Sequence, residues 1–301
     1  MMGAKEYLDF QNGAELLELC KTHSLPISEV MRQRELRMGQ QSEEALADKW
    51  RQVLDIMKAA THDPIANPKK SMGGLIGGEA KKLRDHEQNH GSVCGTVLSK
   101  AIAYSMAVLE VNASMGLIVA APTAGSSGVL PGVLMSLMEE FQLEDQKFYD
   151  GLSNASAIGY LLMLNASISG AEAGCQAEVG AASAMTASAV TEIMGGTPEM
   201  CMQAASLALS NLLGLVCDPI AGLVEVPCQS RNAIGAANAL TSAELALSGI
   251  EHPVPFDQMV TAMLKTGRAL PAALRETAIG GNAGTPAGCR IAGCIYGGCE
   301  K

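Results

Sequence analysis

The sequence predicts an all-α protein built as a single large helical domain. Only 3% of its 301 residues are aromatic, and small residues such as alanine, glycine and serine are abundant. This composition favours closely packed helices with small residues at their crossings. Apolar residues also recur at helical spacing along most of the chain. Because 48% of the residues are hydrophobic, these helices can enclose a sizeable core.

Residues 1–60 are expected to form an amphipathic helical entry. From about residue 14, apolar side chains recur at helical spacing on a charged background. Ser28, followed by Glu29, is expected to cap one helix, and Ser42, followed by two glutamates, is expected to cap the next.

Residues 61–93 are predicted to be a loop region rich in glycine, proline and lysine. Two prolines and two Gly-Gly pairs in THDPIANPKKSMGGLIGGEAKK leave no room for long regular structure. The lysines here, Lys70 among them, either form a solvated face or guide an anionic substrate. A functional loop or a domain boundary is therefore expected in this region.

Residues 94–280 are predicted to form the helical catalytic domain, because small and apolar residues dominate from about residue 94. Glycine and proline divide this part into helices expected near 94–119, 129–142, 148–170, 175–194, 199–214, 231–248 and 256–268. Residues 281–301 form a tail rich in glycine and cysteine, and its glycine content predicts no helix.

Charge and the N-terminal sequence narrow the function classes. A formal charge of -10 argues against a nucleic-acid-binding surface, which needs clustered lysine and arginine. The start of the chain lacks the basic and apolar regions of a secretory signal, so a cytoplasmic protein is expected. Lys100 and Glu110 interrupt the most apolar stretch, so no membrane span is expected. Cytoplasmic cysteines are not expected to form disulfides.

Three cysteines, Cys175, Cys217 and Cys228, are candidate metal ligands. Three thiolates can hold an iron-sulfur cluster and leave one iron open to substrate. Asp218 and a proline follow Cys217, which predicts that this cysteine lies at an abrupt helix end, while Cys228 precedes Arg231 at the expected start of the next helix. Their separations of 42 and 11 residues match no compact ligand template, so packing in the core remains an alternative for each.

The other six cysteines receive no assigned ligand role. Cys20, Cys94 and Cys201 lie in helical patterns and are expected to be packing residues. In the tail, Cys289, Cys294 and Cys299 recur every five residues, which is not zinc-finger spacing. They could be exposed thiols, a second metal site or a mobile ligand that reaches the open iron.

The segment APTAGSSGVLPG is a candidate anion-binding loop. Hydroxyl and N–H groups that precede a helix can bind a carboxylate or phosphate. The alternative is an ordinary serine cap, and the segment is not a Walker A loop because no Lys-Ser or Lys-Thr pair follows the glycines. The candidate substrate-binding residues here are Thr123, Ala124, Gly125, Ser126 and Ser127.

Four segments together resemble one family. PTAGSSGVLPGVL, ISGAEAGCQAEVG, CDPIAGLVEVPCQSRN and GGNAGTPAG are similar to the alpha chain of bacterial iron-sulfur L-serine dehydratases, over residues 15–288. The resemblance implies a largely helical alpha domain that converts L-serine to pyruvate and ammonia. It implies a [4Fe-4S] cluster on Cys175, Cys217 and Cys228, and no lysine context suggests pyridoxal phosphate. The cluster's open iron would act as a Lewis acid on the serine hydroxyl.

The resemblance also implies a separate beta subunit, since single-chain members carry an additional N-terminal beta domain. The substrate carboxylate would bind beyond Thr123, with help from Lys70 or Arg231. SMGGLIGG, which begins at Ser71, also resembles the family's substrate-side loop. The general base is not identified. Two related lyases remain alternatives, an L-cysteine desulfidase and an L-threonine dehydratase, because pocket details decide between such substrates. A more distant alternative is a non-catalytic iron-sulfur carrier or redox sensor.

Overall fold

The computed structural model describes residues 8–297, and over this range it confirms the all-α prediction. No described residue belongs to a strand, and the extended backbone contributes one isolated bridge between Cys217 and Arg275. The α-helices are α1 (Gly13–His23), α2 (Ile27–Met38), α3 (Glu43–Ala66), α4 (Glu79–His90), α5 (Gly95–Ala113), α6 (Val129–Glu140), α7 (Asp145–Asn165), α8 (Gly170–Ala173), α9 (Ala181–Ile193), α10 (Pro198–Asn211), α11 (Cys228–Leu247), α12 (Phe256–Ala269) and α13 (Pro286–Ile295). Short 3-10 turns span Ala124–Ser126, Ile220–Gly222 and Ala272–Leu274, and a π-helical turn spans Gln176–Gly180.

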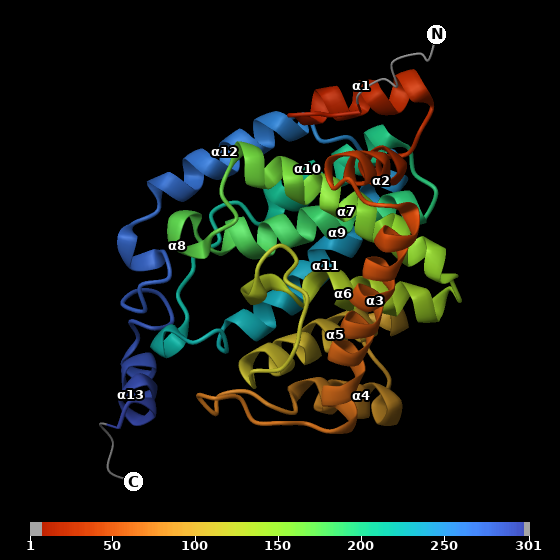
Figure 1. Cartoon of the computed structure of the whole chain (residues 1–301). Coiled ribbons are helices and arrows are strands. Elements are labelled where there is room, and N and C mark those ends of the chain that lie inside the picture. The colour runs from red at the N-terminus through yellow and green to blue at the C-terminus, as the bar shows by residue number, and fades with distance from the viewer. Residues whose placement is uncertain (1–7, 298–301) are drawn as a thin grey trace.

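Helix α9 lies at the centre of the molecule, with α1 at one end of the view and α4 and α13 at the other (Figure 1). It packs against α6, α7, α10 and α11, and all of its residues except Glu192 are buried. Its sequence, AASAMTASAVTEI, consists largely of small residues, so four neighbouring helices can approach it closely. Its buried hydroxyls have hydrogen-bond partners, as when Ser183 donates to the carbonyl of Gly235 at 2.9 Å.

Helices α5 and α6 approach each other at a glycine. A Cβ atom at Gly132 would collide with the side chain of Ser105 and would lie 2.9 Å from the carbonyl oxygen of Ala101. Only glycine therefore fits this crossing without a shift of one helix. The contact matters for the site, because the Thr123–Ser127 loop connects to the N-terminal end of α6.

One of the two expected caps in the helical entry is confirmed, and the other is wrong. The Ser42 hydroxyl caps α3 by accepting the N–H of Ala45 at 3.1 Å. Ser28 does not cap α2, because Pro26 precedes the helix and Ser28 already lies in its first turn. There its N–H donates to the partly buried carboxylate of Glu192 at 3.3 Å. Tertiary contacts rather than a local cap thus fix the start of α2.

The prediction of loop structure across residues 61–93 is wrong for two parts of that range. Helix α3 continues to Ala66 with Pro64 near its end, and α4 occupies Glu79–His90. The start of α4 is stabilised by Glu110 of α5, whose carboxylate accepts the N–H groups of Gly78 and Ala80, both at 2.9 Å. Because this capping group comes from another helix, local sequence could not reveal it.

The tail was also expected to lack a helix, yet α13 spans Pro286–Ile295. Its first turn has a strong start signal, because Thr285 accepts the N–H of Gly288 at 3.0 Å and Pro286 occupies the first helical position. These capping groups outweigh the unfavourable helix propensity of the glycines. Cys299 lies outside the described residues.

Glu139 of α6 ties three helices together away from the cysteines. Its carboxylate accepts hydrogen bonds from His62 of α3 at 2.8 Å and from Lys100 and Tyr104 of α5. Burial opposes ionisation, but these donors hold the pKa of Glu139 at about 2. The hydrogen bond to Glu139 raises the pKa of His62.

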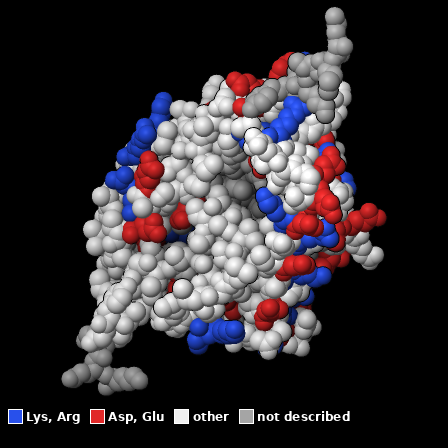
Figure 2. Space-filling model, in the orientation of Figure 1, with Lys and Arg blue, Asp and Glu red and all other residues white. Residues whose placement is uncertain are grey.

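The surface charge and the helices of the described residues relate to two functional classes considered above, nucleic-acid binding and membrane spanning. Figure 2 shows a face on which basic and acidic side chains are mixed near the edges and the centre carries few charges. This face therefore presents no continuous basic patch of the kind that binds nucleic acid. Among the helices of residues 8–297, none combines the length and the apolar character needed to cross a membrane.

Candidate functional site

Three cysteines from segments far apart in the sequence meet at one end of α11. Cys175 precedes the π-helical turn, Cys217 lies in an extended segment, and Cys228 is the first residue of α11. All three are buried, with 2%, 2% and 6% of their surface exposed. Cys217 and Cys228 line the same cavity, whose volume is about 260 Å³. The structure thus places Cys175 next to Cys217, and Cys217 on the same cavity as Cys228.

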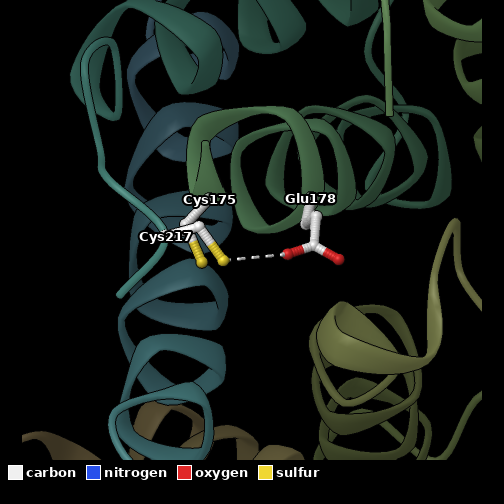
Figure 3. Close-up of side chains that lie close together, drawn as sticks. All are labelled: Cys175, Glu178 and Cys217. Carbon is white, nitrogen blue, oxygen red and sulfur yellow. Dashed lines mark hydrogen bonds between the residues drawn. The ribbon is translucent and has the colours of Figure 1, made fainter. Parts of the chain in front are cut away.

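Glu178 completes a compact group with two of these cysteines. The sulfur atoms of Cys175 and Cys217 and a carboxylate oxygen of Glu178 all lie within 4.8 Å of one another. Figure 3 shows the two sulfurs side by side, with the carboxylate facing them. The Cys217 thiol donates to Oε2 of Glu178 at 3.8 Å, and burial raises the pKa of Glu178.

The predicted helix end at Cys217 is wrong, because α10 already ends at Asn211. Instead, backbone hydrogen bonds hold Cys217 in an extended conformation. Its N–H donates to the carbonyl of Leu274 at 2.9 Å, and its carbonyl accepts the N–H of Glu276 at 2.7 Å. By contrast, Cys228 does lie at a helix start, as predicted, although α11 begins at Cys228 itself rather than near residue 231.

Glycine allows the chain to place Cys175 beside this extended segment. Gly174 has a φ of +77°, a conformation that L side chains rarely adopt. A Cβ atom there would also lie 2.7 Å from Leu270 and 2.8 Å from the carbonyl oxygen of Leu215. Glycine is therefore required at position 174 both by the backbone conformation and by the limited space around it.

Arg231 is partly buried and is engaged by other groups. It forms a 2.7 Å ion pair with Asp218 and donates to the carbonyl of Val216 at 2.8 Å. Hydrogen bonding with Cys217, together with the nearby Arg231 guanidinium, lowers the pKa of Cys175 against the opposing effect of burial. Arg231 therefore provides a positive charge next to the thiols.

The three thiols differ in how readily they lose a proton in this structure. Hydrogen bonding with Cys175, followed by burial, raises the pKa of Cys217. Burial also raises the pKa of Cys228. Of these cysteines, Cys175 is thus the most readily ionised, and binding of a cation is needed to favour the thiolates of the other two.

The candidate anion-binding loop lies on the same cavity, but its members have different roles. Thr123, Ala124 and Gly125 line the cavity, and the Thr123 hydroxyl donates to Oε1 of Glu178 at 3.0 Å. Ser126 and Ser127 are fully buried. They bond within the loop, where the Ser126 and Thr123 hydroxyls lie 3.0 Å apart and Ser127 donates to the carbonyl of Ala124 at 2.8 Å.

Asn232 of α11 fixes this loop and was not identified from the sequence. Its side chain donates to the carbonyl of Gly125 at 2.8 Å and accepts the N–H of Gly128 at 3.0 Å. It lies one turn after Cys228, so the residue that anchors the loop and the third cysteine share one helix. The sequence signal was its position in the polar run CQSRN.

The remaining candidate substrate residues do not line the cysteine cavity. Ser71 is buried and donates to Oε2 of Glu225 at 2.7 Å, while Lys70 is exposed. The carboxylate of Glu225 also accepts the N–H groups of Gly73 at 2.6 Å and Leu75 at 3.0 Å. In this conformation, Glu225, which lies between Cys217 and Cys228 in the sequence, therefore accepts the hydrogen bonds of the SMGGLIGG loop.

Glu178 and Glu276 line the cavity and were missed by the sequence reasoning. A signal for Glu178 was present, because it is the only charged residue between Glu172 and Glu192. A single acid in such an apolar run must be buried together with its helix. Glu276 gave no such signal, because its surroundings resemble an ordinary polar turn.

The described tail cysteines lie on α13 and are exposed. The Cys289 thiol donates to the carbonyl of Ala283 at 3.6 Å. Cys294 lines a separate cavity of about 600 Å³ between α13 and the loop that contains Gly73 and Leu75. In this structure, neither Cys289 nor Cys294 lines the cavity of Cys217 and Cys228.

Comparison with known proteins places the chain in one family. A family model described as "Serine dehydratase alpha chain" matches residues 22–283. A Bacillus subtilis protein named "Probable L-serine dehydratase, alpha chain" is 44% identical, with 96% of each chain covered. The "L-serine dehydratase, alpha chain" of Peptoniphilus asaccharolyticus is 42% identical over 92% of this chain and 95% of its own. The Escherichia coli "L-serine dehydratase TdcG" is 35% identical over 91% of this chain but only 61% of its own length. The chain therefore belongs to the serine dehydratase alpha chain family.

Proposed function

We propose that this chain is the alpha subunit of an L-serine dehydratase, a lyase that converts L-serine to pyruvate and ammonia. The observation that carries the proposal is the group of three buried cysteines beside the Thr123–Gly125 loop, in a member of this family. The relatives named alpha chain match it over nearly their whole length. The cavity of about 260 Å³ suits a substrate of amino-acid size.

We further propose that Cys175, Cys217 and Cys228 hold a [4Fe-4S] cluster. The donor set fits this group, because iron-sulfur clusters are bound by cysteine thiolates, Cys175 lies next to Cys217, and Cys228 lines the same cavity as Cys217. The partly buried Arg231 adds a positive charge that favours thiolates. When bound, a cluster with three cysteine ligands supplies Lewis acidity at an iron that is open to the serine hydroxyl.

The residues of the chain itself would bind and orient the substrate. The Thr123 hydroxyl and the backbone of Ala124 and Gly125 face the cavity, where they can contact the polar groups of serine. Asn232 holds this loop in place. Loss of the α-proton and of hydroxide gives aminoacrylate, whose tautomer hydrolyses to pyruvate and ammonia.

We propose a separate beta subunit as partner and a cytoplasmic location. The relatives with similar chain lengths are named alpha chain, whereas this chain covers only 61% of the E. coli relative. The beta subunit would supply part of the acid-base machinery. The division of the chain into regions at 1–60, 61–93, 94–280 and 281–301 remains a prediction, although α3, α4 and α13 occupy parts of the second and fourth regions. The substrate role of Lys70, Ser71 and Arg231 also remains a prediction.

The test is to purify the chain with its beta partner without oxygen and to measure iron, sulfide and pyruvate release from L-serine. Replacing any one of Cys175, Cys217 or Cys228 by serine should abolish cluster content and activity together. Cys201→Ser is the matched control, because Cys201 is fully buried on α10 and outside the cavity lining. It should keep the cluster.

Two results would reject these proposals. Full activity in a metal-free preparation would reject the cluster. Faster turnover of L-threonine, or release of sulfide from L-cysteine without turnover of L-serine, would assign the same site to another amino-acid lyase.

A further inference from the structure

We propose that Glu178 binds the α-ammonium group of the substrate. This inference rests on the proposed function, which makes the substrate an amino acid. Glu178 lies opposite the cysteines in the cavity, where its carboxylate faces Cys175 and Cys217 (Figure 3). A residue that contacts the ammonium group would orient the substrate relative to the cysteine site.

The charge in the cavity favours a cationic ligand group. Two carboxylates, from Glu178 and Glu276, line it together with Thr123, Cys217 and Cys228, and its described lining contains no lysine or arginine. Glu178 is partly buried, and a carboxylate withdrawn from water is costly unless a cation or several donors compensate for the lost water. The α-ammonium is the cationic group of serine and can provide that compensation.

The hydrogen bonds of Glu178 leave room for such a partner. Oε1 accepts from the Thr123 hydroxyl at 3.0 Å, and Oε2 accepts from the Cys217 thiol at a longer 3.8 Å. A carboxylate oxygen can accept more than one hydrogen bond, and the contact of Oε2 with Cys217 is long. Oε2 of Glu178 is therefore the oxygen that can accept from the N–H donors of an ammonium group.

Glycines fix the position of this carboxylate. A Cβ atom at Gly170 would lie 2.5 Å from Oε2 of Glu178, and one at Gly125 would lie 3.2 Å from Oε1. Any larger side chain at Gly170 would push the carboxylate out of its place. Glu178 is thus held against the substrate loop on one side and beside Cys217 on the other.

The experiment compares L-serine with 3-hydroxypropanoate, which has the hydroxyl and carboxylate of serine but no ammonium group. The anaerobically prepared complex carries Glu178→Gln, Glu178→Asp or the control Glu172→Gln. Glu172 is a nearby exposed acid that bonds Ser167 outside the cavity. The readouts are kcat and KM for L-serine, the inhibition constant of 3-hydroxypropanoate, and iron and sulfide content with the visible absorbance of the cluster.

Glu178→Gln should raise KM for L-serine on the order of ten- to a hundredfold, the range expected for a lost charge-assisted hydrogen bond. It should change the inhibition constant of 3-hydroxypropanoate by less than about twofold and leave the cluster content intact. Glu178→Asp, which keeps the charge, should be intermediate and provides the comparison if the glutamine variant fails to fold. Glu172→Gln should match the wild type.

Three results would overturn the assignment. The first is an unchanged KM for L-serine. The second is an equal loss of serine and 3-hydroxypropanoate binding, which would mean general damage to the cavity. The third is loss of the cluster in Glu178→Gln, which would make Glu178 a residue of the metal site. A wild-type complex that holds a cluster but neither converts L-serine nor binds 3-hydroxypropanoate would overturn the proposed function as well.

Discussion

Glu225→Gln should loosen the loop at residues 71–77 without unfolding the protein. Glu225 is 2% exposed, and its carboxylate accepts three hydrogen bonds from that loop. A glutamine keeps one oxygen, which can serve Ser71 and Leu75, but its NH₂ group then faces the N–H of Gly73. The loop loses one acceptor, and its two other bonds are no longer charge-assisted.

The magnitude follows from these three bonds. An unsatisfied buried N–H costs about 1–3 kcal/mol, and each of the other two bonds weakens by about 1 kcal/mol. Removal of a buried charge offsets part of this loss. The net cost is about 2 kcal/mol, which corresponds to a roughly thirtyfold increase in the population of the open loop.

Limited trypsin digestion measures this opening, because Lys69 and Lys70 are exposed immediately before the loop. When the loop opens and closes faster than trypsin cuts, the cleavage rate follows the population of the open form. Ser71→Ala, which removes one donor, should give a smaller increase than Glu225→Gln. Glu251→Gln, at an exposed acid, should give none. Cleavage of Glu225→Gln at the wild-type rate, or equally faster cleavage at all exposed lysines, would refute the reasoning.

Two further predictions concern stability. Glu139 has a pKa of about 2, below its ordinary value of 4.5. Its contribution to the free energy of unfolding should therefore be fully present above pH 4.5 and be lost as the pH falls towards 2. The raised pKa of His62 gives the opposite sign, with a contribution present below pH 6.5 and lost as the pH rises through the folded-state value. The difference in melting temperature between wild type and Glu139→Gln, followed by circular dichroism, should therefore narrow at both extremes, and a difference independent of pH would contradict this. In chemical denaturation, Gly132→Ala should lower the free energy of unfolding by about 1–3 kcal/mol, because the new Cβ would collide with Ser105. Gly180→Ala is the control, because its Cβ would make an ordinary 3.7 Å contact, and it should be neutral or stabilising by up to about 1 kcal/mol. Equal effects of the two variants would show that the helix crossing at Gly132 is not tight.

The helical domain was predictable because local rules decide its elements. Apolar spacing and glycine breaks predicted helices near 129–142 and 256–268, and the structure has α6 at Val129–Glu140 and α12 at Phe256–Ala269. The predictions failed where a distant group decides. The first N–H groups of helix α4 donate to the carboxylate of Glu110, which belongs to α5. No sequence pattern within residues 61–93 could therefore reveal where this helix begins.

In the tail, the Thr285–Pro286 start signal was present in the sequence but was outweighed in the prediction by the glycine content. A cap satisfies N–H groups that have no partner within the helix, whereas each glycine adds only a modest propensity cost. Local hydrogen bonds at the first turn therefore decide the start of α13 more strongly than the average composition of the tail does.

The sequence by itself determined the helical class, the family resemblance and which cysteines to consider, because periodicity, composition and motifs are written along the chain. Only the tertiary structure decided that Cys175 and Cys217 lie together facing Glu178, and that Cys228 lines the same cavity as Cys217 and Glu178. It also decided that Ser71 and Arg231 bond Glu225 and Asp218 rather than line the cavity. The physical reason is that Cys175 and Cys217, 42 positions apart, come into contact only when the helices between them pack together. The burial and the electrostatic environment of the site also arise from that packing.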